Sequence, residues 1–128
     1  MPRKFMQYWG PVLCWAGLIF AVSGISSFPR QVQPIFSFDK LAHSVEYGVF
    51  GFLLARAFGN AVPEKMRKKF RFFAIIGGVI YGASDELHQY FVPMRSASVI
   101  DLFYDAVGVF LGQLFYKKEL FDKENIHD

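Results

Sequence analysis

The sequence predicts an all-α membrane protein, a compact bundle of four transmembrane helices with both the N and C termini in the cytoplasm. Three observations support this fold class. Of the 128 residues, 53% are hydrophobic and 19% are aromatic, which is too apolar for an ordinary soluble domain of this length. The charged residues fall in short blocks between apolar runs. All but three of the 14 Lys and Arg residues are predicted to lie on one side of the membrane, and such a bias marks the cytoplasmic side.

The first predicted helix covers residues 8–27. No charged side chain occurs between Phe5 and Pro29, and the hydrocarbon core of a bilayer needs about 20 helical residues. Tyr8 and Trp9 stand at one end, where interfacial aromatic residues gather. A signal peptide would also have basic residues before an apolar run, but this run is longer than a signal-peptide core and other spans follow it. We therefore expect a retained helix.

The other three predicted helices cover residues 40–58, 70–91 and 97–116. They carry polar residues, so their prediction rests on length and on the flanking charge blocks. We expect one domain over residues 1–128, ending in a charged cytoplasmic tail at 117–128. The basic residues on the predicted outer side are Arg30, Lys40 and Arg95. Those on the predicted cytoplasmic side are Arg3, Lys4, Arg56, Lys65, Arg67, Lys68, Lys69, Arg71, Lys117, Lys118 and Lys123.

Several classes of function are disfavoured by composition. Cys14 is the single cysteine, so neither a disulfide framework nor a cysteine-based metal site is expected. The net charge of +3 is not spread over a soluble face, so we expect no nucleic-acid partner. Small residues recur at a spacing of four, which predicts either a homo-oligomer face or close packing within the bundle. These pairs are Gly51 and Ala55, Gly78 and Gly82, and Gly108 and Gly112.

Ionisable residues gather at the outer ends of the last three predicted helices. Ionised groups at membrane depth are costly unless they are paired or hydrated, so such a cluster is a candidate functional site. Spacings of three and four place Asp39, His43, Glu46 and Tyr47 on one helix face, and Tyr81, Asp85, His88 and Gln89 on another. The first helix has no polar stripe and is expected to serve as a scaffold.

Two sets of candidate site residues follow. Carboxylates and imidazoles suit general acid and base roles, and the candidate catalytic residues are His43, Glu46, Asp85, Glu86 and His88. The candidate substrate-binding residues are Lys40, Tyr47, Gln89, Arg95, Ser96, Asp101 and Asp105. The guanidinium of Arg95 suits an anionic head group. Asp105 lies about 6 Å deeper than Asp101, so it needs a proton, water, or a partner among Arg95, Lys40 and a histidine.

Three linked motifs resemble the VanZ-like family of small bacterial membrane proteins. They are Asp39-Lys-Leu-Ala-His-Ser-Val-Glu-Tyr-Gly-Val-Phe-Gly51, Tyr81-Gly-Ala-Ser-Asp-Glu-Leu-His-Gln89 and Arg95-Ser-Ala-Ser-Val-Ile-Asp101. The resemblance covers roughly residues 35–116. The family pattern has asparagine where this chain has Asp105. The resemblance implies a multi-pass protein of the bacterial cytoplasmic membrane that acts at the cell envelope, because the founding member is linked to reduced susceptibility to the glycopeptide teicoplanin.

Several interpretations of this site remain open. The first is an enzyme that acts on a lipid-linked or cell-wall precursor at the outer leaflet. The second is a non-catalytic binding or scaffold protein that holds a membrane lipid, a glycopeptide antibiotic or a partner helix. A third adds a metal ion to the His43-x-x-Glu46 and Asp85-x-x-His88 pairs, although no metalloprotease-type signature is present. A transporter is disfavoured because the cluster lies near one surface and no internal repeat is visible. The residues do not identify a cofactor.

Overall fold

The computed structural model describes residues 2–24, 38–92 and 98–117, which form five helices. They are α1 (Pro2–Ser23), α2 (Phe38–Asn60), α3 (Glu64–Arg67), α4 (Phe70–Tyr90) and α5 (Val99–Phe115). No strand occurs within these described ranges. The all-α prediction is therefore confirmed for the part of the chain that the structure covers.

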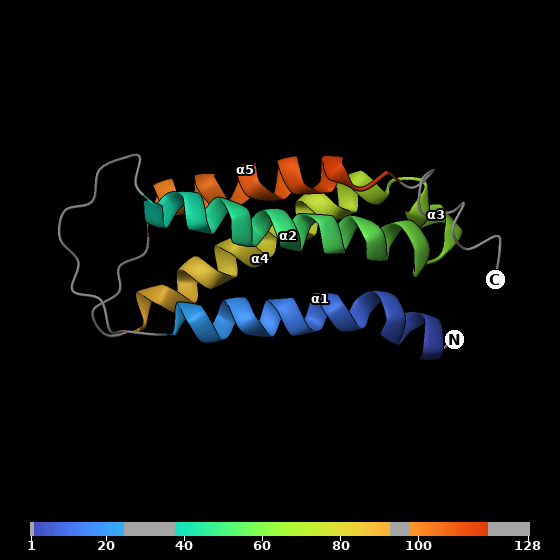
Figure 1. Cartoon of the computed structure of the whole chain (residues 1–128), viewed down its shortest axis with the longest axis horizontal. Helices are drawn as coiled ribbons and strands as arrows, with labels where there is room; N and C mark the ends of the chain where they lie inside the picture. Colours follow the sequence, from blue (N-terminus) through green and yellow to red (C-terminus); the bar gives the residue numbers. More distant parts are fainter. Residues whose placement is uncertain (1, 25–37, 93–97, 118–128) are drawn as a thin grey trace.

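The four long helices form an elongated bundle (Figure 1). Helix α2 is central, because it contacts α1, α3, α4 and α5. Its most extensive partner is α5, which lies along it, while α4 crosses behind the pair. The start of α1, the short α3 and the end of α5 lie together at one end of the bundle, which we call the basic end. We call the opposite end the polar end.

The predicted helix boundaries are correct to within a few residues for three helices. Helix α1 begins at Pro2, six residues before the predicted 8, and includes Pro11 in its interior. The short α3 was not predicted; it begins directly after Pro63 within the segment expected to be a loop. By length and apolar composition, α1 (Arg3–Ser23) is the one described helix that qualifies as a candidate membrane span. Polar residues interrupt α2 and α4, as the sequence led us to expect, whereas α5 is strongly apolar but has only 17 residues.

The recurring small residues serve packing within the bundle. A Cβ atom on Gly112 would overlap the carbonyl group of Gly48, and one on Gly108 would overlap that of Ser44. Likewise, a Cβ atom on Gly51 would overlap the backbone of Val109. The backbones of α2 and α5 thus approach each other at a distance that only glycine permits. Of the two sequence-based interpretations, internal packing accounts for these residues.

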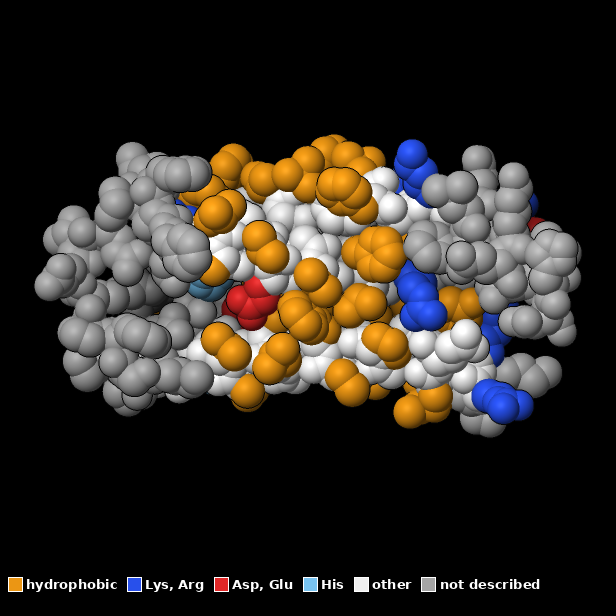
Figure 2. Space-filling view, in the orientation of Figure 1, with side chains coloured by type: hydrophobic (Ala, Val, Ile, Leu, Met, Phe, Trp, Pro, Cys, Tyr) orange, Lys and Arg blue, Asp and Glu red, His pale blue; other side chains and the backbone are white. Residues whose placement is uncertain are grey.

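Different polar groups occupy the two ends of the bundle (Figure 2). Most of the Lys and Arg side chains in view lie at the basic end, the main acidic patch and the His side chain lie toward the other, and hydrophobic side chains cover the middle. At the basic end, Arg71 of α4 donates from Nη1 to the side-chain oxygen of Gln113 (2.9 Å) and from Nη2 to the backbone oxygen of Tyr116 (3.0 Å). This ties the last turn of α5 to the start of α4.

Candidate functional site

Four helices bring polar side chains together at the polar end. We call this set the polar cluster: Ser23, Lys40, His43, Tyr47, Asp85, Glu86, Gln89, Asp101 and Asp105. Its acidic members are removed from solvent, with exposed fractions of 3% for Asp85, 6% for Glu86, 4% for Asp101 and 1% for Asp105. Buried carboxylates of this kind occur where they are paired, or where function requires them.

Three side-chain pairs join α2 to its neighbours. Lys40 Nζ lies 2.9 Å from Asp101 Oδ1, and His43 Nδ1 lies 3.1 Å from Asp105 Oδ1. The hydroxyl of Tyr47 donates to Asp85 Oδ2 at 2.9 Å. The sequence suggested a histidine as one possible partner of Asp105, and the structure shows that His43 is this partner. Lys40 instead pairs with Asp101.

The first residues of α5 and its N-cap are held by hydrogen bonds to the cluster. The backbone N–H of Ser98 donates to Glu86 Oε2 at 2.9 Å, and the Ser98 hydroxyl accepts from the backbone N–H of Asp101 at 3.5 Å. Ser98 is therefore the N-cap of α5. Ser98 was not among the predicted site residues, although serine followed three residues later by an acidic residue is a known start signal for helices.

Helix α1 also takes part in the site, which corrects the expectation that it is only a scaffold. Ser23, near its end, is buried and accepts a hydrogen bond from Gln89 Nε2 at 3.4 Å. Phe20 stacks on the ring of His88 with 4.0 Å between centroids. Trp15 Nε1 donates to the backbone oxygen of Glu46 at 2.9 Å. A single serine at the end of an apolar run gave little sequence signal for this role.

Five polar atoms of this region are buried without a hydrogen-bond partner among the described residues. They are Asp85 Oδ1, Glu86 Oε1, His88 Nδ1, Gln89 Oε1 and Asp105 Oδ2. Four of the five are oxygens of carboxyl or amide groups, which accept hydrogen bonds. Buried polar atoms are nearly always paired, so these atoms stand out. Part of the hydrogen-bonding capacity of the cluster is therefore unused among the described residues.

The structure brings most of the predicted residues into one cluster but leaves some apart. Glu46 is half-buried and lies within electrostatic range of Tyr47 and Tyr81. Arg95 and Ser96 lie outside the described residues, as does the side chain of Asp39. Within the described ranges, no three His, Cys, Asp or Glu side chains are placed to hold a metal ion together. The geometry therefore gives no support to the metal-binding alternative.

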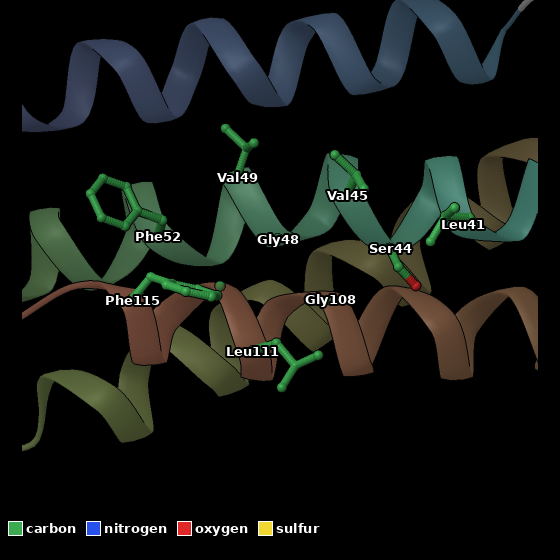
Figure 3. A pocket seen from close by; sticks show the side chains of 10 residues that line it. Leu41, Ser44, Val45, Gly48, Val49, Phe52, Gly108, Leu111 and Phe115 are labelled. Atoms are coloured by element: carbon green, nitrogen blue, oxygen red, sulfur yellow. The ribbon is translucent and has the colours of Figure 1, made fainter.

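An apolar groove of about 450 Å³ runs along the seam between α2 and α5 (Figure 3). Leu41, Val45 and Phe52 of α2 line it together with Leu111 and Phe115 of α5. Its polar lining includes Ser44, whose hydroxyl donates to the backbone oxygen of Tyr104 at 3.0 Å. The groove begins at Leu41, directly after Lys40 of the polar cluster, and runs toward the basic end.

Fold and site together define a helical-bundle protein with a buried, acceptor-rich polar cluster at one end. Comparison with protein families agrees with the motifs: the model of the VanZ/LLP1 family matches residues 5–122, nearly the whole chain. The chain belongs to this family, whose members are generally associated with membranes. Neither a curated protein nor a solved structure matched the chain.

Proposed function

We propose that this chain is a multi-pass protein of the bacterial cytoplasmic membrane that binds the polar head of an envelope lipid or lipid-linked cell-wall precursor. Helices α1, α2, α4 and α5 have 22, 23, 21 and 17 residues, and spanning helices have roughly 17–25. The excess of Lys and Arg supports an orientation with the basic end in the cytoplasm. The polar cluster then lies toward the outer leaflet, where lipid-linked wall precursors are used.

The unpartnered acceptor oxygens carry this proposal. All four of these oxygens belong to side chains of α4 and α5. Asp105 of α5 lies within electrostatic range of both Asp85 and Asp101. A cluster rich in acceptors favours a ligand that offers hydrogen-bond donors, such as sugar hydroxyls or an ammonium group. It disfavours a phosphate, which would face several carboxylates. An anionic part of the ligand suits Arg95 in the segment that joins α4 and α5.

A second candidate function is catalysis on the bound head group. The observation that favours it is the His43–Asp105 pair, in which a buried carboxylate lies 3.1 Å from one ring nitrogen of an imidazole. Such a carboxylate orients the ring and supports its use as a general base. Asp85, next to the pair in the cluster, would then contact the substrate. Reduced susceptibility to teicoplanin would follow from either binding or conversion of a wall precursor.

Envelope chemistry tests the proposed function. Lipids, wall precursors and teicoplanin susceptibility are to be compared among wild type, a strain lacking the protein, and an Asp85→Asn variant. We expect Asp85→Asn to behave like the strain lacking the protein, because the amide has one acceptor oxygen fewer. An accumulating precursor identifies a reaction, whereas altered susceptibility with unchanged chemistry identifies binding. The matched control is Glu64→Gln, which changes a carboxylate exposed to 74%. The proposal is contradicted if the Asp85→Asn variant and the strain lacking the protein both behave like wild type.

The α2–α5 groove is expected to hold the hydrocarbon chain of the same ligand, since it begins beside the polar cluster. Gly48 lines the groove, and a Cβ atom there would meet only the Gly108 carbonyl oxygen, at an ordinary 3.5 Å, so Gly48→Leu adds a side chain to the groove. We expect ligand binding to fall roughly fivefold to thirtyfold through lost dispersion contacts. Gly17→Leu is the control, because a Cβ atom there meets nothing within 4 Å. Equal binding by the two variants contradicts this role of the groove.

A further inference from the structure

A second pocket lies at the basic end, far from the polar cluster along the bundle. Its volume is about 330 Å³, and it is lined by residues from the start of α1 and from the connection between α2 and α3. Lys4 and Arg67 supply its charged groups, and Phe5, Val62 and Pro63 supply an apolar wall. The pocket therefore combines two cations with an apolar surface.

The pocket is held open by contacts between α1 and the end of α2. Trp9 Nε1 donates to the backbone oxygen of Ala61 at 3.0 Å, which fixes the chain just after α2. Asn60 Nδ2 donates to the backbone oxygen of Arg56 at 2.8 Å and to the hydroxyl of Tyr116 at 2.6 Å. These bonds set the positions of Asn60 and Ala61 independently of any ligand.

The charge in this pocket is not balanced by the residues that line it. None of the described lining residues is acidic. Glu64, three residues before Arg67, is exposed and faces Lys68 at 3.9 Å. Arg67 Nε is buried and has no acceptor among the described residues. The lining thus carries two cationic side chains and no described carboxylate, which is a charge distribution that favours an anion.

We propose that this pocket binds the phosphate group of an anionic membrane lipid, with Arg67 and Lys4 as its ligands. A guanidinium presents a planar set of donors that matches phosphate oxygens, and an ammonium adds a point charge. The apolar wall fits the glycerol and upper acyl region of such a lipid. In the proposed orientation the pocket lies at the inner leaflet. This site goes beyond the proposed outer-leaflet function, and the lipid binding proposed here does not depend on that function.

Native mass spectrometry of the full-length protein tests this site. Retention of phosphatidylglycerol is to be compared with that of phosphatidylcholine, for wild type and for a double variant, Lys4→Gln with Arg67→Gln. The matched control, Lys65→Gln with Lys69→Gln, removes the same charge from exposed residues that do not line the pocket. Because Lys4 and Arg67 would bind the lipid phosphate directly through charge-assisted hydrogen bonds, we expect the pocket variant to lose roughly tenfold to thirtyfold of the preference for phosphatidylglycerol. The control should retain most of it.

Two outcomes would overturn the proposal. Equal losses in the pocket variant and the control would mean that diffuse surface charge attracts the lipid. Displacement of phosphatidylglycerol by millimolar inorganic phosphate would mean that the pocket holds a free anion instead of a lipid head group. Neither readout depends on teicoplanin susceptibility or on the polar cluster.

Discussion

Gly112→Ala is expected to lower the free energy of unfolding by about 2–3 kcal/mol, although it adds only one methyl group. That methyl group would overlap the carbonyl group of Gly48, so α2 and α5 would have to move apart. The Gly108 contact with Ser44, one turn away, would be lost in the same movement. The measurement is reversible unfolding of the purified protein in mixed micelles with increasing dodecyl sulfate.

Gly17→Ala provides the matched control for this prediction. A Cβ atom on Gly17 meets nothing within 4 Å, and alanine is a better helix former than glycine by about 1 kcal/mol. The control should therefore be as stable as wild type or slightly more stable. If Gly112→Ala were equally stable, the close contact between the α2 and α5 backbones would be wrong.

Tyr47→Phe is expected to destabilise the protein by about 1–3 kcal/mol. The Tyr47 side chain is fully buried, and its hydroxyl donates to Asp85 Oδ2. Phenylalanine keeps the ring contacts but removes this donor. Because Asp85 Oδ1 already lacks a partner among the described residues, the whole carboxylate would then be buried without a hydrogen bond from them. The same unfolding measurement checks this prediction.

Adding Asp85→Leu to Tyr47→Phe is expected to restore stability. Leucine has a branched end of nearly the same shape as the carboxylate, and replacing both members of a buried hydrogen-bonded pair by apolar groups can be neutral or stabilising. The double variant should thus be at least as stable as wild type. A double variant less stable than Tyr47→Phe alone would mean that Asp85 has a structural role of its own.

The helices of this protein are largely predictable because charged blocks separate its apolar runs. The start of α4 at Phe70 coincides with the prediction, since a block of basic residues ends there. Helix α1 begins earlier than predicted. The charged residues Arg3 and Lys4 were expected to precede the helix, but they belong to its first turn. The short α3 has too few residues for a periodic pattern, so the sequence offered only Pro63 as a signal.

The pairings within the polar cluster were less predictable than its membership. Helical periodicity tells which residues share a face, but not which residue of the next helix they meet. That register depends on the close contacts of Gly108 and Gly112 with α2. Those contacts place Lys40 beside Asp101 and His43 beside Asp105, at sequence separations of 61 and 62. Ser23 was missed for the same reason, because only packing of α1 against α4 brings it to Gln89.

The same register leaves part of the hydrogen-bonding capacity of the cluster unused among the described residues. The pairs between α2 and its neighbours satisfy one oxygen each of Asp85 and Asp105, while the second oxygen of each has no partner among the described residues. A network selected for stability alone would be fully paired or replaced by apolar residues. We therefore attribute the unpaired oxygens to ligand binding.

Mass spectrometry of the lipids that co-purify with the stable double variant, Tyr47→Phe with Asp85→Leu, tests this attribution most directly. Wild type is predicted to retain an envelope lipid or lipid-linked precursor whose head group carries hydroxyl or ammonium donors. The double variant, folded and equally stable, is predicted to lose that species while retaining the bulk membrane lipids. Recovery of the same species in the same amount from both proteins would contradict a ligand site at the polar cluster.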